Sequence, residues 1–105
     1  MAQDQHAAAI TIINKAMHLR PDYIELYVHR AEAFLMLTDF QSAILNYKRA
    51  CVMDPNQTQY YNRLAFVYYF QGQCLYDQKL YPEALEAFSR ATEMRPEVIG
   101  YHLRR

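Results

Sequence analysis

Three prolines divide the chain at long and nearly regular intervals. Each follows a phrase of similar character: Leu19-Arg20-Pro21, Met53-Asp54-Pro55 and Met94-Arg95-Pro96. The interval from Pro55 to Pro96 is seven residues longer than the interval from Pro21 to Pro55. Fixed periods of roughly 20 to 50 residues are typical of arrays built from stacked supersecondary units. We therefore expect repeats rather than a single irregular globule.

A frame of small and large residues precedes each of these prolines. One alanine lies five residues before the proline and another lies twelve before it, with a large side chain between them. Offsets of three, four and seven place these residues on one stripe of a helix, where alanine lets a neighbouring helix approach and the larger residue fills the space beside it. Three equivalent helices are predicted, carrying Ala9, Ile13 and Ala16; Ala43, Tyr47 and Ala50; and Ala84, Phe88 and Ala91.

Another amphipathic helix is predicted ahead of the second and the third of these helices. Asp22 followed by Glu25 resembles a capping box at the start of one of them, and Pro82 suits the first turn of a later helix, where its missing N–H costs nothing. Arg30 is expected to be a paired, partly buried residue whose aliphatic stem covers apolar surface. The packing stripes of the two additional helices are Tyr27, Arg30, Ala31 and Phe34, and Tyr61, Leu64, Ala65 and Tyr68.

A helix–turn–helix unit with the spacing of Pro21 and Pro55, closed by Asp-Pro or Arg-Pro, resembles the tetratricopeptide repeat (TPR), whose period is about 34 residues. The resemblance covers nearly the whole chain, with two departures: alanine replaces the family's glycine at Ala31 and Ala65, and the second unit is seven residues longer. The small and large positions of the family pattern are matched by Ala31, Ala43, Ala50, Tyr27, Phe34, Phe40, Tyr47 and Pro55 in one unit and by Ala65, Ala84, Ala91, Tyr61, Tyr68, Tyr81, Phe88 and Pro96 in the next.

The resemblance implies an all-α fold, a TPR-like α-solenoid of antiparallel helix pairs with about two full repeats plus a leading and a trailing partial repeat. Residues 1–20 would be the second helix of a preceding partial repeat and 21–55 repeat one. Residues 56–96 would be repeat two and 97–105 the start of a following or capping helix. These abrupt ends suggest a fragment of a longer array, and we expect weak self-association through its exposed apolar faces.

The seven additional residues of repeat two are predicted to lengthen its first helix. Seven residues make nearly two helical turns, so the insertion would rotate the remainder of the helix by only about 20°. We favour one helix from about Thr58 to Gln78. The alternative ends that helix at Gly72 and leaves Gln73 to Lys79 as a surface loop.

Composition and motifs narrow the classes of function. Eleven basic residues balance eleven acidic ones, so the chain lacks the positive field that attracts nucleic acids and anionic membranes. The longest apolar run is far below the roughly 20 residues that span a bilayer, and no signal peptide opens the chain. We expect a cytoplasmic protein, with a nuclear location left open. Cys51, Cys74 and the four scattered histidines indicate no metal site, and no catalytic signature or cofactor motif is present, so an enzyme is not expected.

In the TPR family the first helix of each unit lines a concave groove that receives a peptide or partner helix. The corresponding strip of this chain is mostly apolar and aromatic, which favours a protein or peptide partner. The alternative is a structural spacer or self-association segment with the groove covered within the full-length protein. The implied groove residues are Glu25, Val28, Glu32, Leu35 and Met36 from repeat one and Gln59, Asn62, Phe66, Tyr69 and Phe70 from repeat two.

A minor alternative is a co-chaperone module that binds the terminal carboxylates of heat-shock chaperones. That branch of the family uses lysine and asparagine side chains in the groove. Val28 and Glu32 stand at two of those places, and the carboxylate of Glu32 would repel an anionic tail. Asn62 is displaced by one residue, and Gly100 stands where another lysine is expected.

Overall fold

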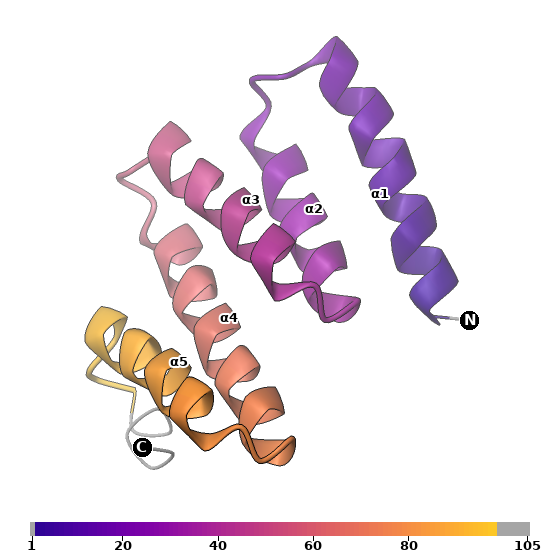
Figure 1. The fold of residues 1–105 in the computed structure, drawn as a ribbon. Coiled ribbons are helices and arrows are strands. Elements are labelled where there is room, and N and C mark those ends of the chain that lie inside the picture. The colour runs from indigo at the N-terminus through magenta and orange to yellow at the C-terminus, as the bar shows by residue number, and fades with distance from the viewer. Residues whose placement is uncertain (1, 99–105) are drawn as a thin grey trace. The chain divides into compact units, whose positions relative to one another are not determined.

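The computed structural model describes residues 2–98, with side chains from Gln5 onward. Most of the predicted trailing segment 97–105, including Gly100, lies outside the described residues. The described residues, 2–98, form helices and no strand, so the all-α prediction is confirmed (Figure 1). The helices are α1 (Ala2–Leu19), α2 (Ile24–Met36), α3 (Phe40–Met53), α4 (Thr58–Asp77) and α5 (Tyr81–Met94).

The chain divides into two compact units, Met1–Tyr60 and Tyr61–Arg105, with the boundary in the first turn of α4. In the first unit α2 packs against both α1 and α3. In the second unit α5 packs against α4 through the ring of Phe88, which contacts Gly72 and Tyr69. Each unit is therefore built from helices that are consecutive in the chain.

A turn of the same kind follows α1, α3 and α5, and each contains one of the regularly spaced prolines. The residue before the proline accepts a hydrogen bond from the N–H three residues further on, as in a β-turn with proline at its second position. Before their prolines, Asp54 and Arg95 have ψ of 82° and 76°, outside the helical region that a following proline disfavours. The bonds run from Tyr23 to Arg20, from Gln57 to Asp54 and from Val98 to Arg95, each with an N···O distance of 3.2 Å.

The α2–α3 and α4–α5 connections are tight turns of a second kind. Thr38 and Lys79 take the left-handed conformation, with φ of 59° and 66°. The two residues are equivalent when the repeats are aligned on their closing prolines, Pro55 and Pro96. Both turns are Schellman motifs, which satisfy the last carbonyls of the preceding helix. The bonds run from Asp39 N to Phe34 O and Thr38 N to Leu35 O in one turn, and from Leu80 N to Leu75 O and Lys79 N to Tyr76 O in the other, all at 2.9 Å.

The helix starts only partly follow the sequence pattern. The predicted capping box of Asp22 and Glu25 is wrong: Tyr23 is the N-cap of α2, and its side chain makes no capping hydrogen bond. The reason is that Asp22 belongs to the proline turn, so the helix begins later than the pattern indicates. Asp39 does cap α3, accepting from the backbone N–H of Ser42 at 3.2 Å, and Pro82 lies in the first turn of α5, as predicted.

Helix α4 continues through Gly72 to Asp77 without interruption. The alternative of a surface loop from Gln73 to Lys79 is therefore wrong for residues 73–77, and only Gln78 and Lys79 form the turn. An internal glycine costs a helix about 1 kcal/mol. Here the absence of a side chain allows α4 and Phe88 to approach closely, because a Cβ atom at Gly72 would lie 2.7 Å from ring atoms of Phe88.

Gly72 shows how the seven-residue insertion is accommodated. When repeat two is aligned with repeat one on the preceding prolines, Pro21 and Pro55, the counterpart of Ala31 is Ala65. When the repeats are aligned on the closing prolines instead, the counterpart of Ala31 is Gly72. Both counterparts are buried. The family pattern identifies only Ala65, and the structure adds Gly72, which packs on Phe88 of α5.

The core contains many of the predicted small and large residues, but the prediction is wrong for two of the large ones: Tyr61 and Tyr81 are 44% and 51% exposed. Tyr47 and Phe88 are the bulky side chains that fill the space between helices, and both are almost completely buried. The prediction that the alanines form buried notches is confirmed for Ala31, Ala43, Ala50, Ala65, Ala84 and Ala91.

Candidate peptide-binding surface

The predicted groove residues of α2 do not all reach the surface. Val28 and Leu35 are buried and belong to the core. Glu32 is half-buried, whereas Glu25 and Met36 are exposed. On α2, a partner could therefore contact chiefly the residues at the two ends of the predicted strip.

The predicted groove residues of α4 are more accessible. Gln59 is exposed and lies in the first unit, whereas Asn62, Tyr69 and Phe70 are half-buried. Phe66 is 46% exposed.

Within the second unit, Phe66 is the centre of an aromatic cluster on α4. Its ring centroid lies 6.5 Å from that of Tyr69 and 6.2 Å from that of Phe70. Tyr69 in turn packs on Phe88 of the core, with centroids 5.7 Å apart. The exposed ring of Phe66 is thus supported by two half-buried rings, of which Tyr69 is anchored to the core.

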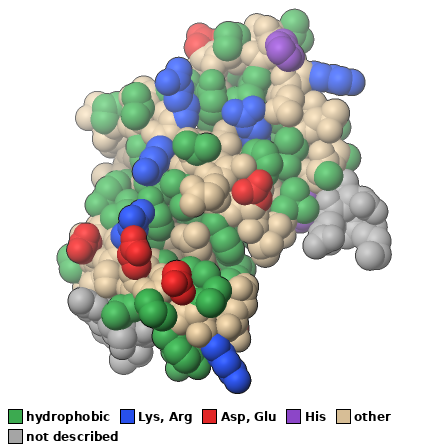
Figure 2. Space-filling view, in the orientation of Figure 1, with side chains coloured by type: hydrophobic (Ala, Val, Ile, Leu, Met, Phe, Trp, Pro, Cys, Tyr) green, Lys and Arg blue, Asp and Glu red, His purple; other side chains and the backbone are tan. Residues whose placement is uncertain are grey.

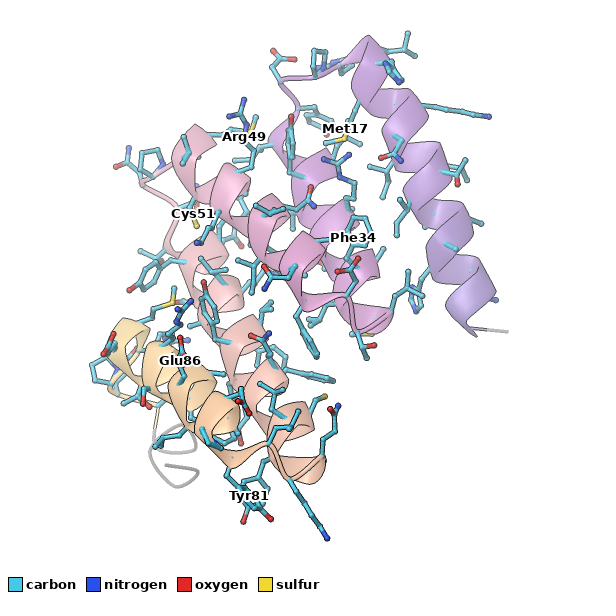
Figure 3. The ribbon with its side chains drawn as sticks, viewed as in Figure 1. Met17, Phe34, Arg49, Cys51, Tyr81 and Glu86 are labelled. Atoms are coloured by element: carbon cyan, nitrogen blue, oxygen red, sulfur yellow. The ribbon has the colours of Figure 1, made fainter. Side chains whose placement is uncertain are left out.

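The structure extends this surface beyond the residues predicted from sequence. Gln73 donates a hydrogen bond from Nε2 to the hydroxyl of Tyr69 at 3.1 Å. Tyr76 is 47% exposed and packs edge-on against Tyr81, with centroids 5.2 Å apart. Tyr81 projects at the turn between α4 and α5 in Figure 3. We name the stripe of α4 formed by Phe66, Tyr69, Gln73 and Tyr76 the aromatic ridge.

Gln73 and Tyr76 are missed when the positions of repeat two are counted forward from Pro55. Both residues are identified when the repeats are aligned on their closing prolines, Pro55 and Pro96. In that alignment the groove positions of repeat one correspond to residues in the later part of α4. In this register the four residues of the aromatic ridge correspond to Glu25, Val28, Glu32 and Leu35.

The aromatic ridge is suited to binding rather than to chemistry. The chain carries no Asp, Glu, Lys or Arg from Leu64 to Tyr76, and aromatic rings with a polar tip combine apolar contact with hydrogen bonding. Burial, and then the charge of Asp77, raise the pKa of the nearby Cys74 thiol. That thiol is therefore protonated at neutral pH and is a poor nucleophile.

Hydrophobic side chains reach the surface over both units in the view of Figure 2. Among the described residues, no set of three His, Cys, Asp or Glu side chains lies together as metal ligands would. No helix within residues 2–98 combines the length and apolar character needed to cross a membrane.

Comparison with known proteins bears on these features. The tetratricopeptide repeat family model matches residues 59–98, which contain nearly all of α4 and the whole of α5. Tetratricopeptide repeat protein 16 of Mus musculus is 41% identical over 104 residues, or 99% of this chain. This chain belongs to the tetratricopeptide repeat family. The human protein of the same name is 40% identical over 97 residues, or 92% of this TPR chain.

The TPR fold predicted from sequence is also confirmed by a solved structure. The Arabidopsis OM64 TPR domain matches with a TM-score of 0.55 and 25% identity, over 96% of this chain and 78% of that domain. The present TPR chain spans only 14% of the mouse relative and 11% of the human one.

Proposed function

We propose that this TPR chain is a protein-interaction scaffold that holds a peptide or partner helix against the aromatic ridge. The observation that carries this proposal is the ring of Phe66, which is nearly half exposed and packs against Tyr69, a ring that in turn packs on Phe88 of the core. Anchoring side chains of this kind tend to dominate the binding energy of an interface. In the first unit, the exposed α2 residues Glu25 and Met36 are proposed as partner contacts in their own right.

The absence of charge along the aromatic ridge favours a partner segment that is itself apolar or aromatic at its contact points. A charged group placed there would lose hydration without gaining a counter-ion. Gln73 and the tyrosine hydroxyls supply hydrogen-bonding groups for the backbone of such a segment. The α2 strip gives the chaperone-tail alternative no support, because its lysine position is occupied by Val28, which is buried.

Replacing Phe66 with alanine tests the proposal. We expect the full chain carrying Phe66→Ala to lose the proteins that the wild-type chain captures, because the exposed anchor is removed. The matched control is Tyr61→Ala, since Tyr61 is a similarly exposed ring, at 44%, on a different face of α4. Affinity capture followed by mass spectrometry measures the outcome. Retention of the same proteins by both variants would contradict groove binding.

A structural brace is the second candidate function, favoured by the contact between Tyr69 and Phe88 in the core. In that case the ridge would be covered within the longer protein, and Phe66→Ala in that protein would lower the free energy of unfolding by about 3 kcal/mol or more, as for a buried ring. A peptide-binding ridge predicts a loss of about 1 kcal/mol or less for the same substitution. Thermal unfolding of the longer protein distinguishes the two functions.

A further inference from the structure

Helix α3 presents an unusual outer face to solvent. Leu45 and Val52 are 66% and 72% exposed, and Lys48 and Arg49 between them are also exposed. Offsets of three, four and seven place the four residues on one side of the helix. We name this set the α3 outer face. It combines two apolar side chains with two cations.

The equivalent faces of the other repeat helices are polar. When α5 is aligned with α3 on their closing prolines, Leu45 and Val52 are replaced by glutamates, and the face reads Glu86, Ser89, Arg90 and Glu93. When α1 is aligned on Pro21 in the same way, its face reads Thr11, Asn14, Lys15 and His18. Polar outer faces are what a solvent-exposed helix normally carries. The apolar residues of α3 are therefore a departure from the pattern of this chain itself.

The charge balance of the α3 outer face also differs from that of α5. Arg90 forms an ion pair with Glu86 at 2.9 Å and lies over Tyr68, 5.7 Å from the ring centroid. Arg49 likewise lies over Tyr27, at 6.0 Å. Leu45, however, takes the place of the glutamate that would neutralise Arg49.

A second cation adds to the positive charge at this point. Arg30 also lies over the ring of Tyr27, at 5.5 Å. Its hydrogen bonds go to neutral groups, Oδ1 of Asn46 at 2.7 Å and Oδ1 of Asn14 at 2.9 Å. Among the described side chains, no carboxylate forms an ion pair with Arg30 or Arg49. In repeat two the place of Arg30 is taken by Gln71, so two uncompensated guanidinium groups beside one ring are peculiar to repeat one.

We propose that the α3 outer face is a docking site for an acidic amphipathic segment of a partner protein. Leu45 and Val52 would contact its apolar side chains, while Lys48 and Arg49 would pair with its carboxylates. Arg49 extends from the C-terminal half of α3 on the side of the α1–α2 connection (Figure 3). Arg30 lies over the same Tyr27 ring and reinforces the positive field there. Complementary charge raises the association rate and selects the partner. The site is on another helix than the aromatic ridge, so it stands independently of the groove.

Fluorescence anisotropy with a defined peptide tests this site. The probe is a labelled peptide of four Glu-Leu-Leu-Glu repeats, added to the full chain. Leu45→Glu would supply Arg49 with the partner that Arg90 has, and Arg49→Gln would remove the charge. We expect each to weaken binding by about tenfold or more, equivalent to about 1.4 kcal/mol. Binding to the wild-type chain should also weaken as salt is raised.

Matched variants and peptides complete the test. Arg90→Gln on α5 and Phe66→Ala on the aromatic ridge should leave the affinity within about twofold, and thermal unfolding should show that all variants are folded. Replacing every glutamate of the peptide with lysine should abolish binding, and a peptide of glutamate alone should bind much more weakly. The proposal is overturned if the wild-type chain does not bind the probe, or if the Leu45→Glu and Arg49→Gln variants bind it normally. It is also overturned if either control peptide binds equally well, or if Phe66→Ala abolishes binding.

Discussion

Thr38 and Lys79 occupy a backbone conformation that usually belongs to glycine. A residue with a Cβ atom pays about 1 kcal/mol or more in the left-handed region, and a β-branched residue such as Thr38 is especially unusual there. Both turns nevertheless form, because the Schellman hydrogen bonds and the packing of the paired helices outweigh this cost. The two residues are local conflicts inside an otherwise consistent fold.

Glycine at these positions should stabilise the protein. We expect Lys79→Gly, and separately Thr38→Gly, to raise the free energy of unfolding by about 0.5 to 1 kcal/mol, measured by urea denaturation. The control is Lys48→Gly, at an exposed position in the interior of α3, which should lower it by about 1 kcal/mol. A loss of stability in both turn variants would show that their side chains make contacts worth more than the strain.

Arg30 shows where residue-level reasoning succeeds. Its place on a packing stripe predicts a paired and partly buried arginine, and its bonds to Asn14 and Asn46 link α1, α2 and α3. The identity of its partners could not be predicted, because they lie 16 residues away on either side. Which side chains meet over that separation depends on how the helices pack.

At the scale of the element, α4 is the segment that the sequence describes least completely. The continued spacing of apolar residues predicts its length, and it does run to Asp77. The spacing does not show which residue of α4 packs on α5, because positions seven residues apart, such as Ala65 and Gly72, lie on nearly the same side of the helix. Either residue satisfies the pattern, and only the contact with Phe88 decides between them.

Gly72 should therefore tolerate no side chain. We expect Gly72→Ala to lower the free energy of unfolding by about 1 to 3 kcal/mol, since the added Cβ would force apart α4 and the rigid ring of Phe88. Thermal unfolding followed by circular dichroism measures the change. The effect should be partly relieved in the double variant with Phe88→Leu, relative to Phe88→Leu alone. Gly72→Ala would be stabilising, by its higher helix propensity, if the contact were unimportant.

At the scale of the whole molecule, exposed apolar residues predict association between copies of the chain. Ile12 and Leu19 of α1 are 67% and 85% exposed and lie seven residues apart on one side of the helix. Weak self-association stays a prediction: sedimentation velocity should show an average mass that rises with concentration. The double variant Ile12→Lys and Leu19→Lys should sediment as a monomer. A wild-type chain that stays monomeric at high concentration would rule the prediction out.

The candidate site was only partly predictable from sequence. The family resemblance predicts Phe66 on the groove side of its helix, and its ring is exposed; the same resemblance predicts Val28 and Leu35 in the groove, but both are buried. Burial at the edge of a packing stripe depends on how closely neighbouring helices approach, which spacing does not specify. The α3 outer face was missed because Leu45 and Val52 stand out only when repeats are compared in the register that the structure revealed.

Sequence by itself determined the helices, the proline turns and the buried alanine notches. These features obey local rules, since the spacing of small residues and the backbone limits of proline act over only a few positions along the chain. Tertiary structure alone decided that Gly72 packs on α5, which groove residues reach solvent and which partners Arg30 bonds. Each of those outcomes depends on the distance between helices, and that distance is set by the combined packing of side chains that lie far apart in the sequence.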